Sequence, residues 1–272
     1  MARIAGHGGN VFVGNQVIED CNDAWNEQVD GDVTLTLDTT DYMVGTGSEK
    51  MVQAGALGVG DILASEVVSL PTLATYTEVL MWAKSSVNIT TAGDYRILLD
   101  NHALCASPEV QVSLPVLTAG VWKFCRCPVV AGAFSAATAV ISVGLKLQAN
   151  DPGAATIHID AIDAAKEVVG IREWSMDVAA GVQDSSAFSD GQSKVFTVTN
   201  LEWSGSFDGF KDGAPLNIGT VVGLELQESS TVTQMWRGSG IITNVTPGSS
   251  VDGLVTYGYS FQGIHALEWP TA

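Results

Sequence analysis

The residues best suited to chemistry in this sequence are carboxylates that stand far apart along the chain. Glu19 and Asp20 lie near the start of an acidic stretch, and Asp160 lies near the end of the long segment that follows it. We expect them to sit on adjacent strands and, with backbone oxygens around Thr46 and Ser48, to hold a calcium ion, because oxygen-only ligands suit Ca²⁺. The alternative is a set of solvated turn carboxylates.

The other reactive side chains form no recognisable site. Cys125 and Cys127 are separated by one residue, which is not C-x-x-C spacing, and the four histidines are scattered. We therefore expect the four cysteines to be buried thiols. The sequence has no G-x-S-x-G motif and no Cys/His arrangement, and its carboxylates fall mainly at turns and on outward strand faces. These patterns predict that the protein is not an enzyme.

The charge of the chain excludes several classes of partner. The formal net charge of the 272 residues is −18, so the surface is expected to repel nucleic acid and anionic membranes. The first residues, MARIAGHGGN, lack the apolar core of a signal peptide, and no apolar run approaches the roughly 20 residues that span a bilayer. We expect a soluble protein without a membrane partner that is not exported by the usual route.

The elements that must position these residues are strands. Apolar and polar residues alternate with period two through most of the chain, and no stretch shows three or more turns of helical periodicity. The middle of the chain has longer and more continuously apolar strands, as in 75–86 and 139–150, which suit a two-sheet sandwich. The sequence predicts an all-β protein. In the C-terminal third the alternating apolar positions include Trp174, Met176, Val178, Leu201, Trp203, Phe207, Val222, Leu224, Leu226, Val255, Tyr257, Tyr259 and Phe261.

Several stretches of the C-terminal third resemble the tail tube proteins of long-tailed bacteriophages. They occur in the family's order as GIREWSMDV (170–178), AFSDG (187–191), LEWSGSFDGF (201–210), WRGSGIITNV (236–245) and VDGLVTYGYSFQG (251–263). The resemblance implies a tail-tube-type β-sandwich or barrel domain. Members commonly carry a helix after the strand that matches 203–210, but residues 211–219 contain Gly213, Pro215 and Gly219, so we expect no helix there.

The same resemblance indicates an insertion. The family's opening strand, which resembles residues 6–17, normally runs straight into the stretch that begins here at Lys166. The tube domain would then comprise residues 1–18 and 165–272, and residues 19–164 would be inserted. The insertion resembles a carbohydrate-binding-module-type jelly-roll sandwich in its acidic start, its DTTDYMVGTGSEKM stretch and its terminal I-H-I-D, and such jelly rolls often hold calcium. We expect its two ends to lie side by side, with Val17 next to Val168.

The tail-tube resemblance implies a structural virion protein. Subunits of this family form rings, typically of six, whose inner strands join into one barrel, and the rings stack with other tail proteins into a channel for DNA. The predicted tube domain has six basic and twelve acidic side chains, a net charge of −6, and the insertion carries −12. A lumen of the same sign as DNA would let the duplex pass without specific binding. An acidic surface that only maintains solubility is the alternative.

The insertion is expected to project outward, because a channel for DNA has no room for it. Trp25 and Tyr42 stand in polar surroundings and are the candidates for glycan recognition, whereas Trp82 and Trp122 are expected in the core. The competing interpretation is a carbohydrate-binding decoration protein of a capsid or cell surface. The tube interpretation implies location in the phage tail of the virion, after assembly in the host cytoplasm.

Overall fold

The computed structural model of the chain describes residues 9–55, 57–186, 194–211, 213–229, 234–249 and 253–270. Within these ranges the protein is all-β, as predicted, with sixteen strands and two short 3-10 helices, η1 (Ala103–Cys105) and η2 (Phe134–Ala136). The predicted AFSDG stretch (187–191) lies outside the described residues. The strands are β1 (Val11–Glu19), β2 (Glu27–Gln28), β3 (Val33–Asp38), β4 (Ser48–Gln53), β5 (Ile62–Val67), β6 (Glu78–Ser85), β7 (Tyr95–Asp100), β8 (Val110–Ser113), β9 (Lys123–Gly132), β10 (Ser142–Leu147), β11 (Ala155–Glu167), β12 (Ile171–Asp184), β13 (Phe196–Phe210), β14 (Val221–Gln227), β15 (Met235–Gly248) and β16 (Thr256–Glu268).

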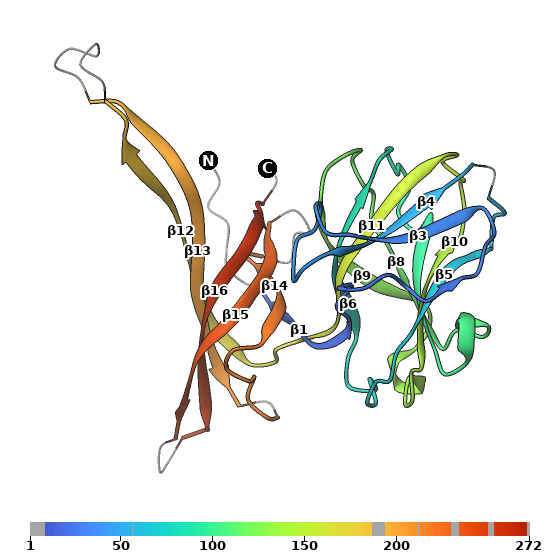
Figure 1. The fold of residues 1–272 in the computed structure, drawn as a ribbon. Coiled ribbons are helices and arrows are strands. Elements are labelled where there is room, and N and C mark those ends of the chain that lie inside the picture. Colours follow the sequence, from blue (N-terminus) through green and yellow to red (C-terminus); the bar gives the residue numbers. More distant parts are fainter. Residues whose placement is uncertain are drawn as a thin grey trace.

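The middle of the chain forms a two-layer sandwich (Figure 1). One layer has the order β3-β4-β11-β6-β9 and the other has the order β2-β5-β10-β7-β8, with β9 hydrogen-bonded to both β6 and β8. The continuously apolar strands predicted for this region face the space between the layers. Their side chains build the larger hydrophobic core, which includes Met51, Met81, Ile97, Leu145 and Ile157, all fully buried.

The C-terminal strands form a second unit in the order β12-β13-β16-β15-β14, continued by β1 (Figure 1). Alternation along β13, β14 and β16 places apolar side chains on one face, where Trp203, Phe207, Leu224 and Phe261 form a smaller core. Leu201 was also predicted to face a core, but it is 63% exposed. The reason is that β13 pairs with β16 only from Ser204 onward, so Leu201 has no second neighbouring strand.

The two units are joined through β1 and β11, which pair antiparallel. Glu19 lies opposite Ile162, so the two ends of the predicted insertion are side by side. The predicted pairing of Val17 with Val168 is wrong, since Val17 lies opposite Asp163 and the Val168 N–H donates to the Val11 carbonyl at 2.8 Å. In an antiparallel ladder the start of one strand meets the end of the other, and the register follows from that rule.

Side chains also hold the units together. Leu80, Trp82 and Phe124, on the outer face of the sandwich, form a third apolar cluster, and Leu80 and Phe124 lie against Gly223 of β14. The Trp82 indole N–H donates to the Ser239 hydroxyl of β15 at 2.9 Å. The sandwich therefore packs against β14 and β15, in addition to being joined to the second unit through β1 and β11.

An ion-pair network crosses the same boundary. Glu225 of β14 is fully buried and accepts hydrogen bonds from Arg126 of β9 at 2.9 Å and from Arg237 of β15 at 2.7 Å. Arg126 also pairs with Glu78 of β6, and its guanidinium carbon lies 3.9 Å from the centre of the Phe12 ring. Loss of one partner would leave an uncompensated buried charge, so the network disfavours separation of the two units.

The region between β13 and β14 contains no helix at residue 211 or at 213–219, as its glycines and proline predicted. No helix in the described part of the chain is long and apolar enough to cross a membrane.

Candidate functional site

The acidic stretch after β1 gathers carboxylates at the end of that strand. Cys21 adopts a positive φ of 55°, a conformation that costs energy for a residue with a side chain, and its N–H donates to Glu19 Oε1 at 2.9 Å. Carboxylate oxygens of Glu19, Asp20 and Asp23 lie within 4.8 Å of one another. The structure thus brings the predicted Glu19 and Asp20 together and adds Asp23.

Two further carboxylates flank this group from inside the fold. Glu49 of β4 and Asp160 of β11 are both fully buried. Glu49 Oε2 accepts a hydrogen bond from the backbone N–H of Trp25 at 2.9 Å, and Asp160 Oδ2 accepts one from the backbone N–H of Met43 at 2.6 Å. The second oxygen of each carboxylate, Glu49 Oε1 and Asp160 Oδ1, is buried without a hydrogen-bond partner among the described residues.

Burial and mutual repulsion perturb these groups. Desolvation, then the charges of neighbouring carboxylates, raises the pKa of Glu19 to about 7 and that of Glu49 to about 8. Desolvation also raises the pKa of Asp160 to about 7, with Asp20 contributing. Burial raises the pKa of the Cys21 thiol, and Glu19, Asp160 and Glu49 raise it further. Several acids that cannot all ionise comfortably are a favourable setting for a cation.

The backbone beside Asp160 is also strained. Ala161 has a positive φ of 49°, where β11 departs from regular pairing with β6 between Asp160 and Asp163. Together with Cys21, it places two such residues beside the carboxylates. Backbone strain of this kind persists where the surrounding structure fixes it, and it often accompanies binding sites.

The remaining predicted ligands lie nearby, in the segment before β4. The Thr46 N–H and hydroxyl both donate to Asn22 Oδ1, at 2.7 and 3.0 Å, and the buried Ser48 hydroxyl donates to the Asp41 carbonyl at 2.7 Å. Their side chains therefore already have protein partners, and only their backbone oxygens are left for the predicted role. Sequence reasoning missed Asp23 and Glu49, although Glu49 occupies an inward position in the alternating SEKMVQ strand.

The two predicted glycan-binding residues have different environments. Trp25 is 3% exposed and packs in the sandwich core, so its ring offers no open face to a sugar, contrary to what its polar sequence neighbours suggested. Tyr42 is half-buried, and its ring lies 6.4 Å from that of His265 in β16, across the boundary between the two units.

A second candidate site is the outer part of the C-terminal sheet. Residues 171–177 of β12, 204–210 of β13, 256–262 of β16 and 241–248 of β15 pair side by side. On one face Trp174, Phe207, Tyr259 and Val245 form an apolar row. The opposite face has mainly polar residues in its neighbouring rows, which are Glu173, Asp208, Gly258 and Thr246, then Ser175, Ser206, Ser260 and Asn244, then Asp177, Ser204, Gln262 and the partly buried Ile241.

The same sheet ends in an unpaired strand and an apolar arm. In the described structure β12 has a hydrogen-bonded neighbour on one side only, β13. The part of β13 that precedes Ser204 and the part of β12 that follows Asp177 continue as a two-stranded ribbon, which projects from the body of the molecule (Figure 1). On this arm Val182 and Val198 face each other and are 63% and 61% exposed, and Phe196 is 58% exposed.

Comparison with known proteins gives limited guidance. No model of a known protein family and no curated protein matches the chain. The tail of an empty gene transfer agent (GTA) particle with C6 symmetry is 18% identical, with 40% of this chain and 87% of that chain covered and a TM-score of 0.33. The virion of a native GTA particle gives 18% identity, 40% and 89% coverage, and a TM-score of 0.33.

A further solved structure that is similar to part of the chain is of another kind. A family 30 carbohydrate-binding module of a cellulosomal cellulase of Clostridium thermocellum is 15% identical, with 56% of this chain and 96% of that chain covered and a TM-score of 0.36. These TM-scores and identities are too low to carry a conclusion about function.

Proposed function

We propose that the protein is a structural subunit of a phage-type tail tube, which assembles into rings that stack into a channel for DNA. The observation that carries the proposal is the outer edge of β12, a fourteen-residue strand that has no partner on that side among the described residues. An open edge of this length is a template for pairing with another chain, and closure of a ring removes it. The proposal assigns no catalysed reaction to the protein.

Edge pairing with a second copy would give each ring a continuous inner barrel. The other edge of this part of the sheet is residues 243–248 of β15, beyond Ile242, whose backbone is hydrogen-bonded to Gly219 and Thr220 just before β14. That edge contains a register shift at Ile242/Asn244 and Pro247, which lacks an N–H, and both features limit uncontrolled strand addition. In the proposed ring, β12 of one copy pairs with this free edge of β15 in the next copy.

The polar face suits a lumen. Glu173, Asp177 and Asp208 stand among serine hydroxyls on the face opposite the small core. Carboxylates repel the phosphates of DNA, so a duplex would slide past this face without release of bound counterions. The exposed valines of the arm would contact the neighbouring ring, because a projecting apolar ribbon gains most by burial against a second copy.

Microscopy of the purified protein with matched variants tests the proposal. We expect rings stacked into tubes by negative stain from the wild type, and rings that do not stack from the double variant Val182→Lys with Val198→Lys, because these exposed valines are proposed to contact the neighbouring ring. The control is Val52→Lys, at a partly exposed position of the sandwich, which should still assemble. If the wild type remains monomeric at high concentration, the tube proposal fails and a decoration protein becomes the better interpretation.

We also propose that the acidic cluster of the sandwich holds calcium as a structural ion. Support comes from the buried carboxylate oxygens Glu49 Oε1 and Asp160 Oδ1, which have no hydrogen-bond partner among the described residues. A divalent cation would offset the charge of Glu19, Asp20 and Asp160, and it would prefer their oxygens to any sulfur ligand. Glycan binding by the sandwich stays a secondary proposal, with Tyr42 as the remaining predicted contact.

Calorimetric titration distinguishes an ion site from solvated carboxylates. We expect saturable binding of Ca²⁺ that Asp160→Asn weakens at least about ten-fold, since it removes one charged ligand. The control Asp177→Asn changes an exposed carboxylate of β12 and should leave binding unchanged. Absence of heat at millimolar calcium, with the protein folded by circular dichroism, would contradict the calcium proposal and leave the tube proposal untouched.

A further inference from the structure

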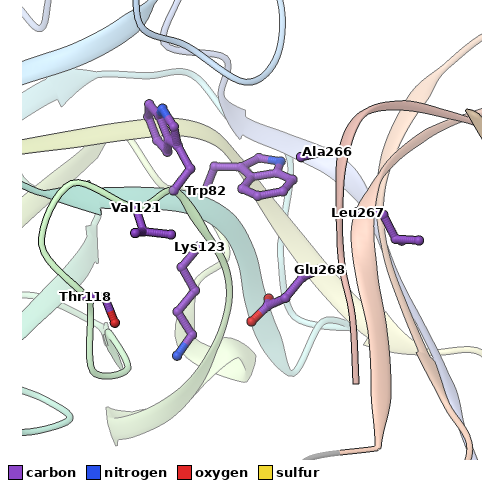
Figure 2. Close-up of a pocket in the computed structure, with 8 residues that line it drawn as sticks. Trp82, Thr118, Val121, Lys123, Ala266, Leu267 and Glu268 are labelled. Carbon is purple, nitrogen blue, oxygen red and sulfur yellow. The ribbon is translucent and has the colours of Figure 1, made fainter. Parts of the chain in front are cut away.

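A cleft of about 350 Å³ lies where the sandwich meets the last strand (Figure 2). Thr118, Val121, Trp122 and Lys123, around the start of β9, line it together with Trp82, and the end of β16 closes the other side. In Figure 2 the Glu268 side chain reaches from that strand toward the segment that carries Val121 and Lys123. None of the residues that line the cleft belongs to the acidic cluster after β1 or to β12.

The β16 side of the cleft is built by an irregular stretch of strand. Glu268 lies opposite Arg237 and Ile264 lies opposite Ser239, so β16 has two more residues here than β15. His265, within this stretch, has a positive φ of 54°. Bulges re-aim side chains near functional sites, and a strained non-glycine residue is retained where its geometry is needed. The extra residues turn residues 266–268 toward the sandwich.

Glu268 presents an unused acceptor to the cleft. Its Oε2 is buried and has no hydrogen-bond partner among the described residues. The two cations nearby are engaged elsewhere, since Arg237 Nε donates to Glu225 at 2.7 Å and Lys123 Nζ donates to the Val116 carbonyl at 3.1 Å. Burial raises the pKa of Glu268, and these two cations offset the effect only in part.

Two indoles beside this carboxylate are fixed in place. The Trp122 indole N–H donates to Asp41 Oδ1 at 2.7 Å, and the Trp82 indole N–H donates to the Ser239 hydroxyl at 2.9 Å. Rings that are already oriented lose little entropy when a ligand packs against them. Trp82 is 2% exposed, so Trp122 is the indole with surface to offer. Its ring already lies 6.0 Å from Lys84 Nζ, which shows that it attracts a cation, and a planar guanidinium also stacks on indole rings.

We propose that this cleft binds an arginine side chain of a partner protein. The guanidinium would pair with Glu268, and its aliphatic stem would pack on Trp122 and Val121, which is 53% exposed. Charge complementarity identifies the occupant, because the cleft holds an unsatisfied carboxylate oxygen and the whole chain, at −18, attracts basic segments. The inference goes beyond tube formation, since edge pairing through β12 does not involve this cleft.

The test uses the full-length protein and N-acetyl-arginine amide as the probe. Tryptophan fluorescence should change saturably at roughly millimolar probe, a strength reasonable for one side chain. The uncharged isostere N-acetyl-citrulline amide should not saturate. Glu268→Gln should weaken binding about ten-fold, and Lys123→Met should strengthen it about three-fold by removing a like charge.

Two controls make the result specific. Glu202→Gln alters an exposed carboxylate on the projecting arm and should leave probe binding unchanged. Tube assembly of each variant, followed by negative stain, reports on the tube proposal separately. Equal binding of the citrulline probe, or no effect of Glu268→Gln in a folded protein, overturns the arginine site. Saturation by cellohexaose without any response to the arginine probe would overturn it in favour of a glycan cleft.

Discussion

At the scale of single residues, the acidic cluster around Cys21 carries more charge than its protein partners neutralise. In the folded protein the pKa of Glu19 is about 7 and that of Glu49 about 8, whereas an unperturbed glutamate lies near 4.5. The folded state therefore binds more protons than the unfolded state between about pH 4.5 and 8. In that window the free energy of unfolding falls as the pH rises.

This sign gives a prediction for urea unfolding. In chelator, the protein should be less stable at pH 8 than at pH 5.5, and calcium at 100 times its dissociation constant should restore about 2.7 kcal/mol at pH 8. The double variant Glu49→Gln with Asp160→Asn should lose the calcium effect and show a smaller pH slope, to which Glu19 still contributes. A stability that rises between pH 5.5 and 8 without calcium would contradict the assigned burial of these acids.

Glu225 makes a second prediction at the residue scale. It is fully buried between Arg126 and Arg237, so Glu225→Ala leaves two guanidinium groups without their shared partner at the boundary of the two units. We expect a loss of about 3 kcal/mol in unfolding free energy. Glu202→Ala, at an exposed position, should cost less than about 0.5 kcal/mol. Equal effects of the two changes would mean that the network contributes little.

At the scale of elements, period-two alternation predicted the strands and most of their inward side chains. It placed Trp203 and Phe207 in a core, but it failed at Leu201, because a pattern along one strand does not reveal where the neighbouring strand ends. The prediction from its polar sequence neighbours that Trp25 is exposed was wrong for a related reason. The adjacent acids turn toward the cluster while the indole turns inward, and only the register between β4 and β11 fixes that choice.

Glycines show how closely these elements are packed. A Cβ built on Gly263 of β16 would lie 2.0 Å from the Trp203 ring, whose other edge lies against Gly238 of β15. Gly263→Ala should therefore displace the indole and cost about 1–3 kcal/mol, with a changed near-UV circular dichroism spectrum. Gly31→Ala, where no atom lies within 4 Å of the new carbon, is the matched control. An unchanged spectrum for Gly263→Ala would argue against this packing.

At the scale of the whole molecule, the two units differ in how completely each buries its own apolar side chains. The sandwich buries its apolar side chains between two layers, whereas the arm of β12 and β13 is a two-stranded ribbon with exposed valines and no second layer. Such a ribbon is marginally stable by itself. Contacts with another molecule would stabilise it, and this is the physical reason for the proposed assembly.

Amide hydrogen exchange turns this contrast into a prediction. In the isolated subunit, residues 178–184 and 196–201 should exchange much faster than β6 and β11, because opening the ribbon exposes little apolar surface. In assembled tubes the arm should slow by at least about 100-fold, since a packed neighbour adds several kcal/mol to the cost of opening. β6 and β11, buried in the sandwich in either state, are the internal control. Protection of the arm in the monomer would contradict the structure, and an arm that stays fast in tubes would exclude it from the contact between rings.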